Sequence, residues 1–187
     1  MNTDKIIPFA LRTIELETSA VSGLKSFIDA DFVRAVSVVA ATRGRLIVSG
    51  IGKSAIIAQK IVATLNSTGT PAVFMHAADA IHGDLGMIQT DDVVLVISKS
   101  GNSPEIKVLA PLVKNFGNTL IGMVGNTESF LAQNSDIVLN TTVEQEACPI
   151  NLAPTSSTTA QMVMGDALAV CLMEIKEFSS RDFAKYH

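Results

Sequence analysis

The chain has 187 residues, of which 48% are hydrophobic and 17% are charged, and its formal net charge at pH 7 is -4. This length suits one well-buried domain and is short for two. The negative charge and the lack of a basic run argue against a nucleic acid as partner. An apolar-rich and charge-poor composition often reflects surface buried between subunits, so we expect a homo-oligomer.

The start of the chain and its hydropathy predict a cytoplasmic protein that does not bind membranes. Residues 1–5 lead into charged, helical-looking sequence and do not resemble a signal peptide. No apolar run approaches the ~20 residues that a bilayer-spanning helix needs. Cys148 and Cys171 have no metal-like spacing, and neither have His76 and His82, so we expect no metal and no cofactor.

Helical periodicity dominates residues 3–42, where Ile7, Leu11 and Ile14 belong to an apolar stripe that we expect to serve in packing. Asp31 is expected to cap a second helix in this segment. Beyond it, strands are predicted at residues 46–48, 71–75, 93–97, 120–124 and 136–139. Helices are predicted at residues 54–65, 104–116, 128–133 and 155–176, and a short last helix is predicted after Ser179 or Ser180, ending at His187.

Strands that alternate with helices predict right-handed crossovers and a parallel sheet. We therefore expect an α/β fold with a doubly wound five-stranded sheet, helices on both faces and additional N-terminal helices. The segment 76–90 is expected to be a loop with one helical turn. The helix at 155–176 is apolar on most sides, which predicts burial in the core or between subunits.

The loop after the strand at 93–97 is the first candidate site. Ser98, Ser100 and Ser103 surround Gly101, and Pro104 and Glu105 open the next helix. Pro is favoured at the first helical position, Ser at the N-cap and Glu in the first turn. Free N–H groups at a helix start favour phosphate. An ordinary strand-to-helix loop is the alternative.

The segment Gly50-Ile51-Gly52-Lys53-Ser54 follows the strand at 46–48 and allows three interpretations. A P-loop is excluded, because its first Gly would fall on Ile47. A dinucleotide fingerprint is permissible, but His76 stands where an acidic residue is wanted after the next strand. We prefer a phosphate-sugar loop in which Gly52, Lys53 and Ser54 meet the ligand; a purely structural turn remains open.

Acidic and hydroxyl side chains complete the candidate set. Glu105 is a possible proton carrier or an ordinary first-turn carboxylate, and Glu146 is a possible proton carrier or a solvated loop acid. Residues 155–159 are five consecutive hydroxyl residues, which can cap the long helix and also bind phosphate. Cys148 lacks a basic partner in sequence and is interpreted as structural, as is His76.

These motifs together resemble the SIS (sugar isomerase) domain family. The resemblance rests on the motif at 98–105, on Gly50 to Ser54, on His-Gly-Asp-Leu-Gly at 82–86, and on Glu-Ala-Cys-Pro at 146–149 with Leu-Ala-Pro-Thr-Ser-Ser-Thr-Thr at 152–159. Within that family the chain looks like the arabinose-5-phosphate isomerase branch. The resemblance covers residues from about 45 to 187, so we expect N-terminal helices at 1–43 and a sugar-phosphate-binding core at 44–187.

The resemblance implies interconversion of D-arabinose 5-phosphate and D-ribulose 5-phosphate through a cis-enediol, in the synthesis of the Kdo sugar of lipopolysaccharide, by a tetramer. The implied catalytic residues are Lys53, His82, Glu105, Glu146 and His187, and the implied phosphate-binding residues are Gly52, Ser54, Ser98, Ser100, Gly101, Ser103, Thr155, Ser156 and Ser157. Glu146 is our first choice for the carbon base, and Glu105 is the second. Alternatives are another phosphosugar isomerase of this fold, or a non-catalytic sugar-phosphate or nucleotide-sugar sensor.

The sequence departs from the family pattern in two places. It ends at His187, where the family continues, and the paired CBS regulatory domains that typically follow are absent, so we expect either a truncated piece or a naturally short form. Lys99 stands where the family often has an uncharged residue. It could add charge to the phosphate site or point outwards, so it is not included among the site residues.

Overall fold

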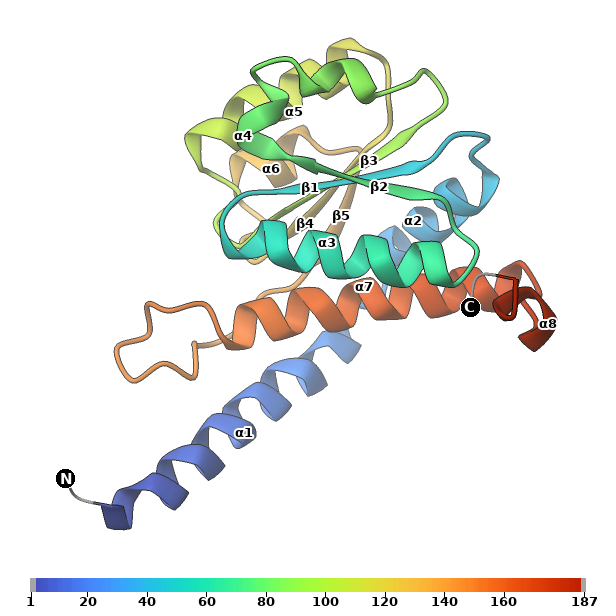
Figure 1. Ribbon diagram of the computed structural model, residues 1–187. Coiled ribbons are helices and arrows are strands. Elements are labelled where there is room, and N and C mark those ends of the chain that lie inside the picture. The colour runs from blue at the N-terminus through green and yellow to red at the C-terminus, as the bar shows by residue number, and fades with distance from the viewer. Residues whose placement is uncertain (1–2, 186–187) are drawn as a thin grey trace.

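Five apolar segments pair in parallel in the computed structural model, which describes residues 3–185 (Figure 1). The strand order is β2-β1-β3-β4-β5. The strands are β1 (Leu46–Gly50), β2 (Ala72–His76), β3 (Val93–Ser98), β4 (Leu120–Val124) and β5 (Ile137–Asn140). β1, β3 and β4 are buried at every position, as expected of central strands covered on both faces. The predicted doubly wound α/β fold is confirmed.

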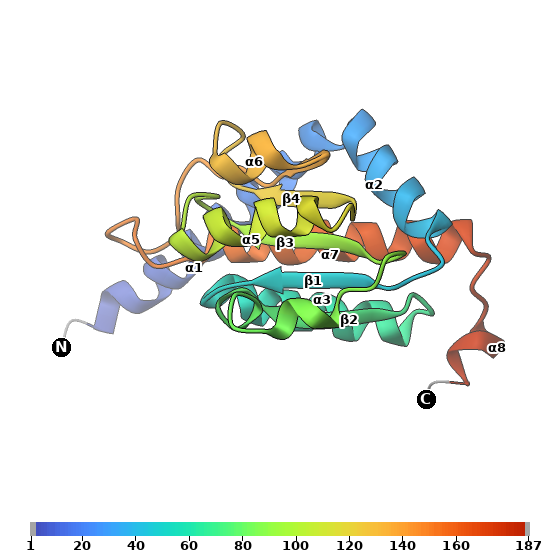
Figure 2. The ribbon, with the colours of Figure 1, turned by 90° about the horizontal axis from the view of Figure 1, so that it is seen from above.

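Helices cover both faces of the sheet (Figures 1 and 2). One face carries α2 (Ala30–Ala41), α3 (Lys53–Ser67) and α7 (Ser156–Ile175), and the other carries α4 (Ala77–Ala80), α5 (Pro104–Asn115) and α6 (Phe130–Asn134). Side chains of β3 alternate between the faces, as the strand period requires. Leu95 joins the core under α3 and α7, and Val96 joins the core under α5.

The carboxyl ends of β1 and β3 mark the point where the strand order reverses. β1 pairs with β2 on one side and with β3 on the other, with Gly50 opposite both His76 and Ile97. The chain leaves β1 through α3 on one face and leaves β3 through α5 on the other face. Open α/β sheets bind ligands at such a reversal, outside the carboxyl ends of the strands.

Helix α7 is central to the fold and corrects one expectation from hydropathy. It is 20 residues long and apolar enough to cross a membrane by length and composition, contrary to the expectation that no apolar run approaches that length. In the fold it packs against α1, α2 and α3 and buries residues such as Met164 and Leu168. This packing buries nine of its 20 residues, as predicted in part for a helix that is apolar on most sides, whereas Val170 and Ile175 are exposed.

Helix α1 (Ile6–Gly23) differs from our expectation of a packing element. It buries no residue within this chain, and Ile7 and Ile14 are 70% and 62% exposed. It runs out from the body of the protein and meets it mainly along α7, where Thr159 donates a hydrogen bond to Glu17 (Figure 1). The apolar stripe was correctly located, and its last members, Leu24 and Phe27, pack in the core. No other part of the described chain covers its first members, Ile7, Leu11 and Ile14.

The start of α2 differs in detail from the prediction, whereas the cap of the last helix agrees with it. α2 is capped by Asp29 and not by Asp31, because the helix begins two residues earlier than expected. Asp31 instead accepts hydrogen bonds from Arg34 and from the N–H of Val138. α8 (Ser180–Phe183) is capped by Ser179 in a capping box with Asp182. Two 3-10 segments, Thr3–Lys5 and Leu24–Phe27, flank α1, and a third, Asp84–Met87, follows α4.

Candidate functional site

A cavity of about 270 Å³ opens at the carboxyl ends of β1 and β3, where the strand order reverses. It is lined by two lysines, Lys53 and Lys99, and by the hydroxyls of Ser54, Ser98, Ser100, Ser103, Ser157 and Thr158, together with Ile51, Pro154 and Gln161. Among the residues that the structure describes, none of those lining it is acidic. Cations and hydroxyl donors without carboxylates suit an anionic ligand.

Three helices begin beside this cavity, and none of them has a side-chain cap from its own N-cap residue in the described chain. The N-caps of α3, α5 and α7 are Gly52, Ser103 and Thr155, and no side chain at these positions accepts a hydrogen bond from its helix. By contrast, Asp29 and Ser129 cap α2 and α6. A helix N-terminus has free N–H groups and a positive dipole end, so these starts favour an anion.

Backbone conformation brings the chain close to the cavity. Gly52 and Gly101 have φ values of 58° and 62°, in the left-handed region that favours glycine. Gly50 allows the backbone of α3 to lie close to β1, because a Cβ at position 50 would lie 2.9 Å from the backbone carbonyl of Ser54. α3 therefore starts directly against the end of β1, and Lys53 and Ser54 are held at the cavity.

The serine loop after β3 is arranged partly by its own hydrogen bonds. Ser98 Oγ accepts a bond of 3.0 Å from the N–H of Gly101, and Ser100 Oγ accepts one of 3.3 Å from the N–H of Asn102. Ser103 occupies the N-cap of α5 as predicted, but its buried Oγ makes no hydrogen bond to the described residues. Because Ser103 also lines the cavity, its hydroxyl is free to bind a ligand there.

Glu146 is the buried carboxylate of the site. Its Oε2 accepts hydrogen bonds from the N–H groups of Thr155 and Ser157 at 2.8 and 3.1 Å and from Thr155 Oγ1. Its Oε1 accepts from Lys99 Nζ at 2.6 Å and from Ser157 Oγ. The side chain is fully buried, so the alternative of a solvated loop acid is wrong. Glu146 occupies the α7 N-terminus, and the free N–H groups of α3 and α5 remain.

The hydrogen bonds of Glu146 determine its ionisation. Burial raises the pKa of this carboxyl, but hydrogen bonds from Lys99, from Ser157 and from the backbone of α7 more than offset this effect, and the pKa falls to about 2. Glu146 is therefore an anion across the physiological range. Thr155 Oγ1 also accepts from the N–H of Ala147, which ties the loop after β5 to the start of α7.

Some of the other predicted residues line the cavity and others do not. Lys53 lines it and forms no ion pair with the described residues. Glu105 is half-buried in the first turn of α5 and does not line the cavity, and His82 is exposed in the turn before the 3-10 segment and does not line it either. The other predicted residues outside the described lining are Gly52, Gly101, Glu146, Thr155 and Ser156. His187 lies outside the described residues.

Sequence reasoning missed five residues that line the cavity, of which Ile51 and Pro154 are apolar and Lys99, Thr158 and Gln161 are polar. Lys99 is not among the predicted site residues, although it contacts both Glu146 and the cavity. Gln161 lies one helical turn after Ser157, accepts a hydrogen bond from Ser54 and is buried. The i, i+4 spacing from Ser157 was the signal that could have identified Gln161. Thr158 belongs to the hydroxyl run that the sequence singles out, but it is missing from the predicted site residues.

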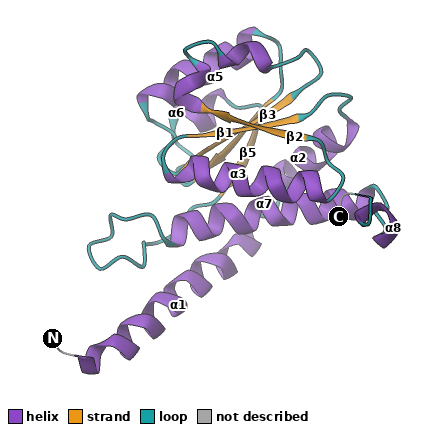
Figure 3. Cartoon of the chain, viewed as in Figure 1, coloured by secondary structure: helices purple, strands orange, loops and turns teal. Residues whose placement is uncertain are grey.

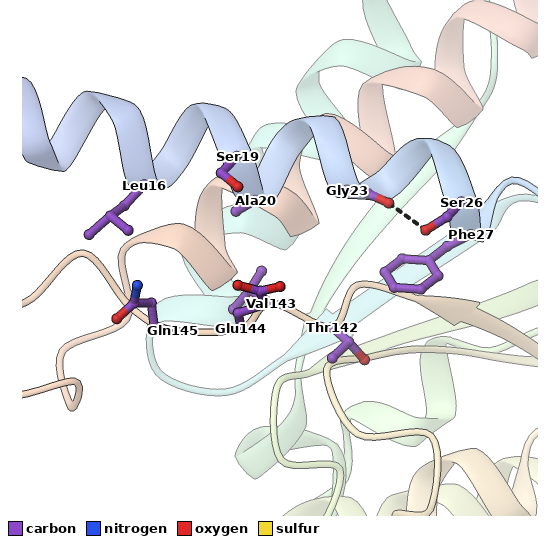
Figure 4. A pocket seen from close by; sticks show the side chains of 10 residues that line it. All are labelled: Leu16, Ser19, Ala20, Gly23, Ser26, Phe27, Thr142, Val143, Glu144 and Gln145. Carbon is purple, nitrogen blue, oxygen red and sulfur yellow. Dashed lines mark hydrogen bonds between the residues drawn. The ribbon is translucent and has the colours of Figure 1, made fainter.

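A second cavity of about 300 Å³ lies between α1 and residues 142–145. Figure 4 shows the side chains of Leu16, Phe27 and Val143 beside those of Glu144 and Gln145. Its described lining contains no lysine or arginine and none of the predicted site residues. This chemistry does not suit a phosphate, so the cavity at β1 and β3 is the candidate site.

The chain resembles known proteins over most of its length. A model of the SIS domain matches residues 41–171. The arabinose 5-phosphate isomerase KdsD of Pseudomonas aeruginosa is 52% identical over 190 residues, which cover 100% of this chain and 58% of that protein. The arabinose 5-phosphate isomerase GutQ of Escherichia coli K12 is 47% identical over 176 residues, which cover 94% of this chain and 55% of that protein.

Solved structures agree with these relatives. A protein of Escherichia coli CFT073, determined in complex with arabinose 5-phosphate, is similar with a TM-score of 0.92 and 39% sequence identity, over 100% of both chains. This chain spans a little more than half the length of the two curated relatives.

The low pKa of Glu146 predicts an acid-sensitive contribution to stability. A carboxyl whose pKa falls from 4.5 to about 2 on folding stabilises the protein above pH 4.5, and this contribution is lost as the pH falls toward 2. We expect a loss of about 3 kcal/mol from this group over the whole pH range, of which about 2 kcal/mol falls between pH 7 and pH 3. This loss is measured by urea unfolding of the wild type and of Glu146→Gln from pH 7 to about pH 3. The difference between their free energies of unfolding should become smaller as the pH falls.

Glu144→Gln is the matched control, because Glu144 is an exposed carboxylate two residues earlier in the same loop. Its free energy of unfolding should follow the wild type at each pH. A difference between wild type and Glu146→Gln that stays constant with pH would contradict the assignment.

Proposed function

The chain belongs to the SIS domain family, and from this premise we propose that it interconverts D-arabinose 5-phosphate and D-ribulose 5-phosphate. The observation that carries the proposal is a cavity of lysines and hydroxyls at the strand-order reversal, with the buried carboxylate of Glu146 bonded to its wall. The names of the curated relatives and the arabinose 5-phosphate bound to a similar structure support the choice of sugar.

The phosphate group fits the serine loop after β3. Ser98, Ser100 and Ser103 line the cavity beside the start of α5, and the Ser103 hydroxyl has no partner in the described chain. Hydroxyl and backbone donors at a helix start bind phosphate oxygens well. Ser54 at the start of α3 faces the same cavity, and we propose it as a further donor.

The isomerisation moves a proton between C2 and C1 through a cis-enediol, and it needs a base at carbon and acid/base groups at the oxygens. We propose Glu146 as the carbon base, with Glu105 as the second choice. Lys53, whose ammonium forms no ion pair with the described residues, would stabilise the negative charge of the enediolate. His82 and His187 are proposed for opening the sugar ring and exchanging protons at oxygen.

We extend the proposal to the cellular setting. Residues 44–187 form the sugar-phosphate core and residues 1–43 the N-terminal helices, in a cytoplasmic enzyme that supplies arabinose 5-phosphate for Kdo and lipopolysaccharide synthesis. The protein is proposed to be a homotetramer. The uncovered apolar stripe of α1, with Ile7, Phe9 and Ile14 all more than half exposed, supports association through this helix.

Proton exchange tests the activity directly. We expect proton NMR of the protein with D-ribulose 5-phosphate in deuterated buffer to reveal arabinose 5-phosphate that carries deuterium at C2. Glu146→Gln should slow this exchange by about 10²- to 10⁴-fold, the usual contribution of a general base. Full exchange in Glu146→Gln would transfer the base role to Glu105, for which Glu105→Gln is the companion variant. Absence of exchange in the wild type would refute the proposed reaction.

Two buried serines test the phosphate site. Ser103 and Ser156 each have a buried hydroxyl without a partner in the described chain, but only Ser103 lines the cavity. Ser103→Ala should raise KM for the sugar phosphate roughly 10- to 100-fold, because a hydrogen bond to a charged group is lost. Ser156→Ala is the matched control, and steady-state kinetics should show a much smaller change. Equal effects of both substitutions would place the phosphate elsewhere.

Sedimentation velocity tests the assembly. We expect a tetramer, and we expect Ile14→Lys to shift the mass toward smaller species because a charge would have to be buried in the α1 contact. A wild-type chain that sediments as a monomer at the concentrations used for kinetics would refute the oligomer.

A further inference from the structure

Lys99 lies between the buried carboxylate and the cavity. Its Nζ donates to Glu146 Oε1 over 2.6 Å, and its side chain also lines the cavity. The side chain of Glu146 is 0% exposed, whereas that of Lys99 is 45% exposed. A lysine has a flexible stem and three donors that can be redirected, so Lys99 is the partner of this pair that can move.

We propose that Lys99 holds Glu146 in an ion pair when the site is empty, and that the phosphate group of the substrate draws Lys99 away, so that Glu146 becomes a competent base only in the filled site. This assignment rests on the proposed isomerase function, since it makes Lys99 a positioning residue for the proposed carbon base. It is a role that the sequence did not predict for Lys99.

A phosphate group bound in the cavity would attract Lys99 strongly. A phosphate monoester carries a charge of about -1.5 to -2 near neutral pH, and a carboxylate carries a charge of -1. Lys99 and Lys53 are the cations of the described lining, and α3 and α5 start beside it without side-chain caps. At an equal distance, a dianion attracts the Lys99 ammonium more strongly than the single charge of Glu146 does.

Glu146 stays in place when Lys99 leaves. Its Oε2 keeps the N–H groups of Thr155 and Ser157, and its Oε1 keeps the hydroxyl of Ser157. The carboxylate is therefore still hydrogen-bonded and buried, but it has lost its cation. Burial raises the pKa of Glu146, and the hydrogen bond from Lys99 is the largest of the contributions that lower it. Removal of Lys99 thus makes Glu146 more basic.

Among the described groups that donate hydrogen bonds to the Glu146 carboxylate, Lys99 is the one that carries a charge. Helix α7 presents hydroxyl and amide groups of Thr155 and Ser157 to it, and Glu17 of α1 is bonded further along, to Thr159. The other ionisable groups of the described chain to consider are Lys53 across the cavity, and Glu144 and Cys148 on its own loop.

Carbon-13 NMR of protein labelled at the glutamate carboxyls tests the proposal without catalysis. The Glu146 signal is identified by its loss in Glu146→Gln, and its titration is followed with and without sulfate, which is a dianion except in strong acid. We expect sulfate to raise the titration midpoint by about one pH unit or more, the usual effect of losing a close opposite charge. An unchanged midpoint overturns the proposal.

Lys99→Met and Lys99→Arg separate the lysine from a direct effect of the anion. In Lys99→Met the midpoint should already be raised without sulfate and should move little when sulfate is added, whereas Lys99→Arg should behave as the wild type does. A sulfate shift in Lys99→Met as large as that in the wild type overturns the proposal. Lys99 is nearly half exposed, so both variants should fold, and the wild-type titration decides the question if they do not.

Kinetics distinguish this proposal from the proposed function. The pH dependence of kcat/KM reports the free enzyme and that of kcat reports the complex. Lys99→Met should move the acid limb of kcat/KM to higher pH and leave the acid limb of kcat in place. A wild type without isomerase activity refutes the function alone, because the sulfate titration still tests the exchange of Lys99. If the acid limb of kcat/KM does not move in Lys99→Met although the enzyme is active, the role of Lys99 is refuted and the proposed function is not.

Discussion

The buried carboxylate of Glu146 joins three parts of the chain that are distant in sequence. It lies in the loop after β5, accepts hydrogen bonds from the first turn of α7 and pairs with Lys99 in the loop after β3. A buried charge is costly unless its environment compensates it, and the N–H groups of Thr155 and Ser157 hold this carboxylate against the start of α7. Glu146 thereby satisfies N–H groups at the N-terminus of α7, whereas α3 and α5 have no side-chain cap from their N-cap residues.

The topology of the sheet supplies the rest of the arrangement. Because β1 and β3 are neighbours and their following helices lie on opposite faces, α3 and α5 start side by side at one edge of the sheet. The loop from Thr141 to Thr155 extends away from the sheet and returns at the same edge to begin α7 (teal in Figure 3). The lining side chains thus come from the ends of strands and helices, and the two lysines among them have long, flexible side chains.

Local patterns in the sequence were sufficient for the fold but only for part of the site. Runs such as 93–97 and 120–124 are short and continuously apolar, so their strands and the parallel sheet could be predicted. Lysine and serine positions at strand ends followed from the same topology. The ion pair of Lys99 with Glu146 spans 47 residues, and no local pattern encodes it. The exposure of α1 could not be predicted either, since an apolar stripe does not reveal which surface covers it.

Gly50 has a consequence for how such a site can change over evolutionary time. With only a hydrogen at this position, the backbone of α3 lies against the end of β1, and a larger residue would displace it. The position of this backbone therefore cannot be changed by exchanging the side chains that line the cavity. Those side chains come from residues 51–54, from the serine loop and from α7, including Thr158 and Gln161. Descendants of this protein that adopt a different ligand would therefore keep Gly50 and diversify in these lining side chains.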